Sequence, residues 1–221
     1  MNRIQVPIFE LKNVTVSYND RIALKISKFQ FHRGTIYGIV GRTGSGKTTL
    51  LKVLTGRLVP TEGQVFYEKE PYQKSWLGKV KLPADISVLD EVDRYKGKVR
   101  DYFNVNVPER FEEIKQNYFK KPRHSSEWNL LMDELSSGLR YRVHLISVIE
   151  SDPKVLVIDD YGMNFDTKLK REFNRRILNT VKSRGTTVIL STTEANSLRN
   201  FATVIVYLDN GHISKVRSYK S

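Results

Sequence analysis

Residues 41–48 read Gly-Arg-Thr-Gly-Ser-Gly-Lys-Thr and match the phosphate-loop pattern G-x-x-x-x-G-K-[ST]. The flanking sequence predicts a buried strand over Thr35–Val40 and a helix over Lys47–Leu54. Glycines let consecutive backbone N–H groups face one anion, and the helix N-terminus adds a partial positive charge. The sequence therefore predicts a nucleoside-triphosphate site in which Lys47 reaches the β- and γ-phosphates and Thr48 holds Mg²⁺. The residues expected to surround the nucleotide are Gly41, Arg42, Thr43, Gly44, Ser45, Gly46, Lys47, Thr48 and Thr49.

The composition limits the class of protein. The chain has 221 residues, of which 39% are hydrophobic, so it can bury the core of an α/β domain. It contains no cysteine, which excludes disulfides and thiolate metal sites and favours an intracellular protein. The formal net charge of +13 indicates anionic partners. No apolar run approaches the ~18–20 residues of a membrane span, and the N-terminus lacks the apolar core of a signal peptide.

Strand-like and helix-like segments alternate along most of the chain. Residues 8–40 repeat apolar side chains with a period of two, which predicts β-structure. Further strands are expected at 63–67, 155–158, 187–190 and 204–208, and further helices at 139–150 and 168–183. We expect an α/β fold with a mainly parallel core sheet, an N-terminal antiparallel β-region and an inserted helical lobe. The predicted division assigns residues 1–86 and 136–221 to the core and 87–135 to the lobe.

A second acidic motif follows the apolar run Val155–Ile158. Asp159 ends this predicted strand, the position expected for a carboxylate that binds Mg²⁺ together with Thr48. Asp159-Asp160-Tyr161-Gly162 also fits the D-x-x-G pattern of GTPases. A GTPase would need a guanine-reading N-K-x-D later in the chain, and the sequence contains none. The apolar strand followed by two acids is therefore the preferred interpretation.

Leu135-Ser136-Ser137-Gly138-Leu139 precedes Asp159 by about twenty residues and resembles the LSGGQ signature of ABC (ATP-binding cassette) ATPases. The resemblance extends over nearly the whole chain and implies the ABC-ATPase fold, with ATP and Mg²⁺ as ligands. It places Tyr18 where the family has an aromatic that stacks on adenine, and Asp166 at the end of the D-loop. It also implies a head-to-tail dimer, in which Ser136 and the Gly138 N–H group meet the γ-phosphate held by the other subunit.

The chain departs from the family at positions that govern hydrolysis. Asp160 stands where the family has the glutamate that polarises the attacking water, and Thr193 stands where it has the switch histidine. Residues 79–85 occupy the Q-loop region and contain no glutamine, while Ser137 and Leu139 replace a glycine and the glutamine of the signature. Asp160 withdraws the carboxylate by roughly 1 Å, and misplacement on that scale can cost ~10²-fold in rate.

Two hypotheses follow for the activity. In the preferred one, the chain is a weak ATPase with Asp160 and Thr193 as catalytic residues, or it is completed by a partner subunit. In the other, it is a nucleotide switch that binds ATP and dimerises but hardly hydrolyses. The resemblance implies a cytoplasmic ATP-binding subunit of an ABC transporter or related complex, peripheral on the cytoplasmic face of the membrane. Its expected partners are a membrane-spanning permease and a second ABC subunit, identical or different.

Basic and aromatic residues interleave over residues 92–123. This mixture could bind nucleic acid, and a soluble switch acting on nucleic acid or ribosomes is the alternative function. A helical lobe with an aromatic core and a basic rim, facing anionic lipid or a membrane partner, explains the same pattern. We prefer the second interpretation, which disfavours nucleic acid and keeps an anionic membrane surface as a possible partner.

Overall fold

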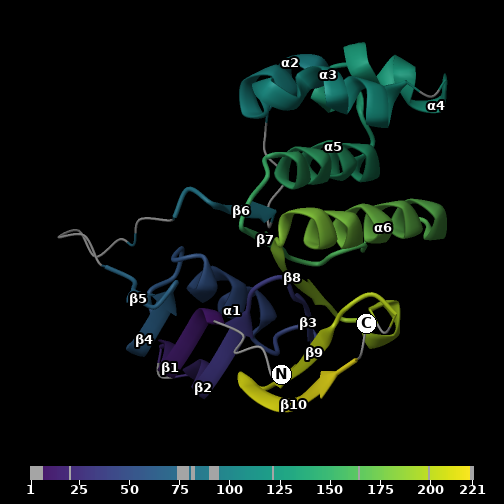
Figure 1. Cartoon of the computed structure of the whole chain (residues 1–221). Helices are drawn as coiled ribbons and strands as arrows, with labels where there is room; N and C mark the ends of the chain where they lie inside the picture. Colours follow the sequence, from purple (N-terminus) through teal and green to yellow (C-terminus); the bar gives the residue numbers. More distant parts are fainter. Residues whose placement is uncertain are drawn as a thin grey trace.

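The computed structural model describes residues 7–19, 21–73, 80, 83–89, 95–120, 122–163, 165–198 and 200–219. Its elements form a β-layer, a central parallel sheet and a stack of helices (Figure 1). Among the described residues, no helix is both long and apolar enough to cross a membrane.

The central sheet has the strand order β10-β9-β3-β8-β7-β6. Its parallel strands are β9 (Val204–Asp209), β3 (Ile36–Val40), β8 (Thr187–Thr192), β7 (Val155–Ile158) and β6 (Ile86–Leu89), and β10 (His212–Ser218) runs antiparallel at the edge. Every residue of β3, β7 and β8 is buried. Strands covered on both faces need such continuous apolar runs, which is why these segments were visible in the sequence.

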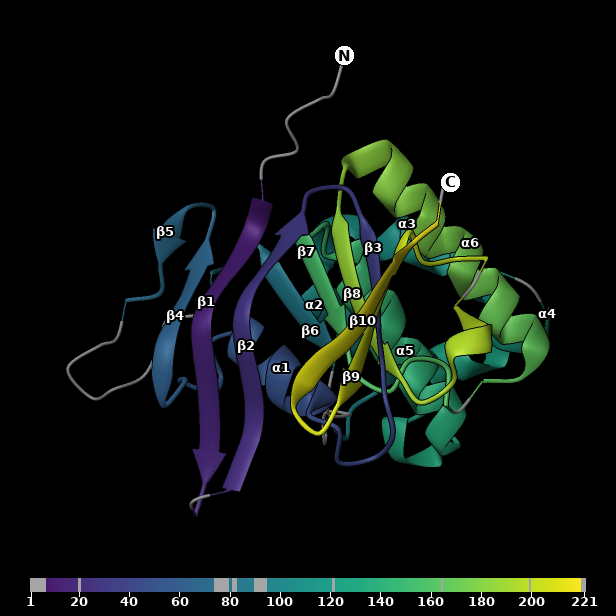
Figure 2. The same ribbon diagram turned by 90° about the horizontal axis from the view of Figure 1, so that it is seen from below.

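The N-terminal β-region forms a second, antiparallel sheet with the order β2-β1-β4-β5. Its strands are β1 (Pro7–Tyr18), β2 (Arg21–His32), β4 (Glu62–Tyr67) and the short β5 (Glu70–Pro71). Helix α1 (Lys47–Leu54) buries Leu50, Leu51 and Leu54 in one hydrophobic cluster with residues from both sheets. Figure 2 shows α1 between β2 and the central sheet. This packing holds the start of α1, and with it the phosphate loop, at the carboxyl end of β3.

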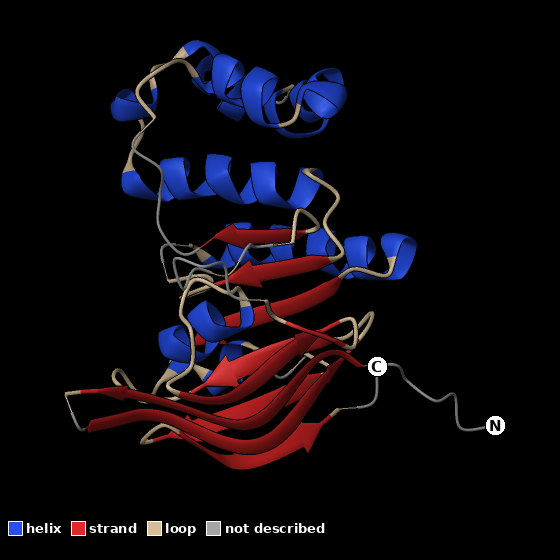
Figure 3. Ribbon diagram, turned by 90° about the vertical axis from the view of Figure 1, so that its left-hand side faces the viewer, coloured by secondary structure: helices blue, strands red, loops and turns tan. Residues whose placement is uncertain are grey.

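Two long helices cover the other face of the central sheet. They are α5 (Ser137–Glu150) and α6 (Thr167–Arg184), which bury Leu145, Ile146, Phe173 and Ile177 in one cluster with β7 and β8. Beyond α5 lies the helical lobe, here residues 99–134, which Figures 1 and 3 show as an outer layer. It contains α2 (Val99–Asn106), η1 (Pro108–Arg110), α3 (Phe111–Ile114), η2 (Lys115–Phe119), α4 (Pro122–Ser125), η3 (Ser126–Asn129) and η4 (Met132–Glu134).

Aromatic rings form the interior of the helical lobe. Trp128 lies 5.8 Å from Phe103, 5.2 Å from Phe111 and 4.9 Å from Phe119, measured between ring centroids. Aromatic pairs at such distances add stability beyond the area that they bury. The predicted lobe therefore has the aromatic core that its sequence indicated.

The structure confirms the expected fold class and moves one boundary. The sequence placed Ser87–Leu89 in the lobe, but these residues belong to β6 and pair with β7 in parallel. A four-residue edge strand carries too short an apolar pattern to be recognised alone. Of the Q-loop region 79–85, only Val80 and 83–85 are described, so the interpretation of that loop lies largely outside the described residues.

Candidate functional site

The phosphate loop bends from β3 into α1 around glycines in left-handed conformations. Gly46 has φ 101°, and a Cβ there would lie 2.8 Å from the Ala23 carbonyl oxygen. A side chain at this position would therefore both strain and displace the backbone. The buried Lys47 ammonium donates to the carbonyl oxygens of Gly41 at 2.9 Å and Arg42 at 3.1 Å. The Lys47 side chain thus lies against the phosphate loop, whose N–H groups are expected to bind the same phosphates as the ammonium.

Thr48 and Asp159, predicted to act together, are in direct contact. The Thr48 hydroxyl donates to Oδ2 of Asp159 at 2.6 Å, although the residues are 111 positions apart. Asp159 is 8% exposed and follows β7 directly. Two hard oxygen ligands therefore lie side by side at the carboxyl edge of the central sheet, where parallel α/β sheets bind their ligands.

Ser191 holds the acidic pair in place, and the sequence analysis missed it. Its hydroxyl donates to Oδ1 of Asp159 and accepts the Asp160 backbone N–H at 2.9 Å. It is fully buried on β8, next to β7. A hydroxyl directly after the apolar run 187–190 was the only signal in the sequence.

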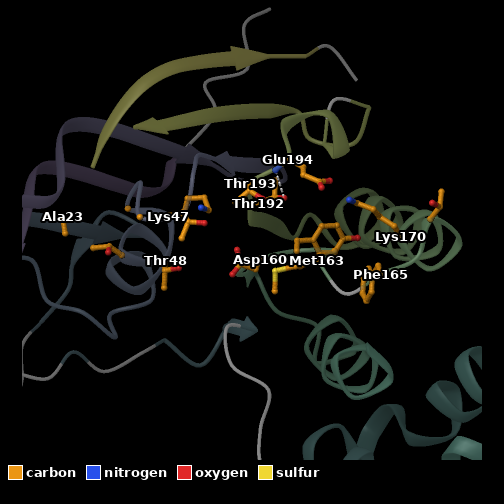
Figure 4. Close-up of a pocket in the computed structure, with 17 residues that line it drawn as sticks. Ala23, Lys47, Thr48, Asp160, Met163, Phe165, Lys170, Thr192, Thr193 and Glu194 are labelled. Atoms are coloured by element: carbon orange, nitrogen blue, oxygen red, sulfur yellow. Dashed lines mark hydrogen bonds between the residues drawn. The ribbon is translucent and has the colours of Figure 1, made fainter. Parts of the chain in front are cut away.

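A cavity of about 690 Å³ opens between the phosphate loop and the carboxyl ends of β7 and β8 (Figure 4). Pockets of this size hold small ligands and cofactors. Of the predicted site residues, the cavity brings together Thr43, Gly44, Gly46, Lys47, Thr48, Thr49, Asp160 and Thr193. Gly41, Arg42 and Ser45 are not among the described residues that line it. Lining residues that the sequence analysis did not propose are Ala23, Tyr161, Gly162, Met163, Phe165, Thr167, Lys170, Thr192 and Glu194.

The two predicted catalytic residues face this cavity from loops. Asp160 is exposed and has a left-handed backbone, φ 47°. Within the described part of the chain, neither its carboxylate nor the Thr193 hydroxyl makes a hydrogen bond that fixes its direction. Burial, and then the charges of Asp159 and Asp160, raise the pKa of Tyr141 on α5. Its phenol therefore stays protonated beside the acidic pair.

Tyr18 lies beside the phosphate loop and is 51% exposed. It lines a neighbouring cavity of about 500 Å³, to which Ala23 and Gly44 also belong. These two residues line the phosphate cavity as well, so the two spaces adjoin. An exposed ring at this position could stack on a planar group attached to a triphosphate.

The signature residues lie away from the phosphate cavity of their own chain. The Ser136 hydroxyl caps α5 by accepting the Leu139 N–H at 3.3 Å, and Asp166 caps α6 by accepting the Leu169 N–H at 2.7 Å. Ser136, Gly138 and Asp166 line a separate cavity of about 390 Å³. Asn164, which with Phe165 and Asp166 resembles the end of the D-loop, lies outside the described residues.

Arg142, the arginine that follows the signature segment, is an interior residue. It is 1% exposed, donates to the Tyr118 carbonyl at 2.8 Å and pairs with Glu127 at 3.0 Å. His124 also contacts Glu127, at 2.7 Å. Burial lowers the pKa of Arg142, while the charge of Glu127 opposes this effect. The arginine therefore fixes the signature helix α5 to the helical lobe.

The phosphate loop, the Thr48–Asp159 pair and the parallel sheet define a P-loop nucleotide-binding protein. The sequence profile of the family described as ABC transporter matches residues 24–161, more than half of the chain. The chain therefore belongs to this family, and the resemblance inferred from its motifs is confirmed. Members of the family are ATP-binding ATPases.

Two curated relatives and one solved structure illustrate the similarity. The chain is 25% identical to the spermidine/putrescine import ATP-binding protein PotA of Mycoplasma capricolum, over 95% of this chain and 61% of that protein. It is 23% identical to the uncharacterized ABC transporter ATP-binding protein YybJ of Bacillus subtilis, over 93% and 94%. Its fold matches the ATP-binding cassette MJ0796, solved as a dimer with ADP and Pi, with a TM-score of 0.79, 22% identity and coverage of 96% and 99%. The chain thus spans about three-fifths of the length of PotA.

Proposed function

We propose that this chain is the ATP-binding subunit of an ABC transporter or related membrane complex. The observation that carries the proposal is the Thr48–Asp159 contact at 2.6 Å beneath an intact phosphate loop, at the edge of a cavity large enough for a nucleotide. In this proposal the backbone of residues 41–49 surrounds the triphosphate, Lys47 leaves its carbonyl partners to meet the phosphates, and Tyr18 stacks on adenine.

The Thr48 hydroxyl and the Asp159 carboxylate form a suitable site for Mg²⁺. This ion is held in nucleotide sites by one or two carboxylates together with phosphate oxygens, so the Thr48 hydroxyl and the Asp159 carboxylate suffice. When bound, Mg²⁺ would neutralise charge that develops on the phosphates. Ser191 donates to Oδ1 of Asp159, and Oδ2 accepts from Thr48, which itself lines the cavity.

The proposed hydrolysis is slow. Asp160 would accept a proton from the attacking water, and Thr193 would contact the γ-phosphate. Both are shorter than the residues that the family has at these positions, and neither side chain is held by another described residue. A general base that must find its own position loses the benefit of preorganisation. Support for turnover comes from the carboxylate retained at position 160.

We also propose that two cassettes associate head to tail on the cytoplasmic face of a membrane-spanning permease. The support is that Ser136 and Gly138 line a cavity distinct from the phosphate cavity. They could complete a nucleotide site only in another subunit. The solved MJ0796 cassette is a dimer, which agrees with this arrangement. Asp166 lies in the same cavity as the signature residues and would face the partner.

Nucleotide binding is tested with Lys47→Ala. Loss of the ammonium that faces the phosphates should lower ATP affinity about 100-fold, because hydrogen bonds to charged groups contribute about 1.5–3 kcal/mol each. The measurement is titration with a fluorescent ATP analogue in the presence of Mg²⁺. Lys52→Ala, on the last turn of the same helix, is the matched control and should bind like the parent. Equal affinity in the Lys47 and Lys52 variants would refute the site.

Association is tested with Ser136→Arg. The larger cation should block closure against a second cassette while ATP binding to the single chain is kept. Light scattering of a turnover-blocked Asp160→Asn background, with and without Mg²⁺-ATP and with the membrane partner present, measures it. Ser183→Arg, on α6, adds the same charge away from the signature segment. The dimer proposal fails if the parent shows one association state in both conditions.

A further inference from the structure

A cavity of about 400 Å³ lies in the helical lobe, outside the nucleotide site. Its described lining residues are Arg100, Lys115, Gln116, Phe119, Lys120, Ser125, Trp128 and Asn129, a set with three cations and no acid. Figure 1 shows the lobe separated from the central sheet by α5. We call this space the cationic cleft. Cations gathered around one cavity repel each other, so the arrangement is unfavourable until an anion enters it.

The backbone of η2 gathers two of these cations on one side. Lys115–Phe119 is a π-helix, in which the hydrogen bonds run from i to i+5. In a regular α-helix, residues five positions apart diverge by about 140° around the axis, since each residue turns about 100°. A π-turn places them roughly one turn apart instead. Lys115 and Lys120 therefore both line the cleft. Single π-turns inside helices occur frequently at functional sites.

Two acids of the lobe pair with cations outside the cleft, and a third pairs with one cation of the cleft. Glu127 is buried and pairs with Arg142 at 3.0 Å and His124 at 2.7 Å, while Glu113 pairs with Arg110 at 2.8 Å. Asp101 reaches only the Arg100 Nε, at 3.5 Å, with both side chains about half exposed. Such an exposed pair contributes about 0–1 kcal/mol. Lys115 and Lys120 have no ion-pair partner among the described residues.

The remaining walls suit an organic phosphate rather than a bare ion. Asn129 accepts a hydrogen bond from Arg100 at 3.3 Å, and both residues line the cleft. Phe119 and Trp128, both buried in the aromatic core, form an apolar floor. A phosphate group has several acceptor oxygens and up to two charges, enough for two lysines and an arginine together. Its carbon skeleton would lie on the aromatic floor.

We propose that the cationic cleft binds the phosphate group of an organic phosphate, supplied either by an acidic phospholipid headgroup or by a soluble phosphate ester. The cleft is separate from the nucleotide site, because it shares no described lining residue with the phosphate cavity. As a lipid site, it would hold the outer lobe against an anionic membrane surface. As a site for a soluble ester, it would let a metabolite bind the lobe.

The full chain is tested with Lys115→Met/Lys120→Met. The first probe is a pair of vesicle preparations, phosphatidylcholine alone and phosphatidylcholine with phosphatidylglycerol, followed by co-sedimentation. Each basic residue at an anionic surface contributes about 1 kcal/mol, so the double variant should bind the anionic vesicles about 30-fold more weakly. The second probe is glycerol 1-phosphate, measured by calorimetry. Both lysines are exposed, so the fold should persist, and unchanged binding of a fluorescent ATP analogue verifies it.

Two further variants make the result specific. Lys182→Met/Lys215→Met removes the same charge from exposed positions on α6 and β10 and should stay within about threefold of the parent. Lys115→Arg/Lys120→Arg keeps the charges and should retain binding. Loss of vesicle binding confined to the cleft variant, without glycerol 1-phosphate binding, supports the lipid source. Glycerol 1-phosphate binding that the cleft variant loses supports the soluble ester.

Three results would overturn the proposal. Equal weakening in both methionine double variants would mean that only net charge matters. Absence of binding to either probe by the parent would leave the cleft without this function. Binding of single-stranded RNA through Lys115 and Lys120, with no response to either phosphate probe, would make the lobe a nucleic-acid surface.

Discussion

The two sides of the phosphate cavity differ in how their side chains are held. Lys47 and Thr48 of the phosphate loop, and Asp159 directly after β7, each make hydrogen bonds that fix their direction. Asp160, the next residue, and Thr193 lie on loops, and within the described residues their side chains have no such bonds. Thr48 and Asp159, the residues proposed to hold Mg²⁺, are therefore prepositioned. Lys47 must exchange its carbonyl partners for phosphate oxygens, and the residues proposed for hydrolysis are not held by described residues. We therefore expect the protein to bind the nucleotide tightly and to hydrolyse it slowly.

The largest effect is expected from removing the charge of Asp159, one of the residues held by hydrogen bonds. In Asp159→Asn, the amide can still bond to Thr48 and Ser191, so folding should be kept while the negative charge is lost. We expect the Mg²⁺-dependent part of ATP affinity, and any turnover, to fall about 100-fold. ATP titration with and without Mg²⁺ measures it. Asp209→Asn, exposed at the end of β9, is the control. An Asp159→Asn variant that keeps its response to Mg²⁺ would contradict the pairing.

The next prediction concerns Asp160 and Thr193, where longer side chains should increase turnover. Asp160→Glu should raise phosphate release about tenfold, since it restores roughly 1 Å of reach, and adding Thr193→His should raise it further. Asp160→Asn should lower whatever turnover the parent has. Steady-state phosphate release with the partner present is the measurement. If all three variants match the parent at background while ATP still binds, the chain is a nucleotide switch. Parent turnover that survives Asp160→Asn undiminished would remove Asp160 as the catalytic carboxylate.

The same contrast explains how far the sequence could be interpreted. The phosphate loop and Asp159 lie at the ends of buried strands with continuous apolar runs, and these two motifs predicted that Thr48 and Asp159 would bind Mg²⁺ together. Ser191 could not be found, because a hydroxyl inside a buried strand has no motif and its partners lie 31 and 32 positions away. Lys170 and Glu194 enter the cavity only through the packing of α6 and the loop after β8.

Helix geometry set a second limit on prediction. The sequence indicated an inserted helical lobe, but a helical period of 3.6 residues cannot reveal the π-turn at Lys115–Phe119. The basic and aromatic residues of this segment could therefore be noticed without being placed. Only the backbone shows that Lys115 and Lys120 share one cavity.

The smallest expected effect concerns the backbone of Asp160. Its φ of 47° lies in the left-handed region, where a non-glycine residue costs about 1–2 kcal/mol, while glycine loses about 0.5–1 kcal/mol through unfolded-state entropy. Asp160→Gly should therefore raise the free energy of unfolding by about 0.5–1 kcal/mol. The N–H bond to Ser191 is kept, and turnover should fall to background. Urea denaturation and phosphate release on the same preparation separate the two effects.

Asn13→Gly is the matched control for this trade-off, because Asn13 has a similar φ of 51° at an exposed position of β1 and lines neither nucleotide cavity. It should gain similar stability without losing turnover. The positive φ at position 160 also affects the Asp160→Glu variant, since glutamate tolerates positive φ less well than aspartate. Asp160→Glu should thus combine faster turnover with a lower free energy of unfolding. A stability loss in Asp160→Gly would show that the aspartate side chain stabilises the loop, and the loose side of the cavity would then be more ordered than its hydrogen bonds indicate.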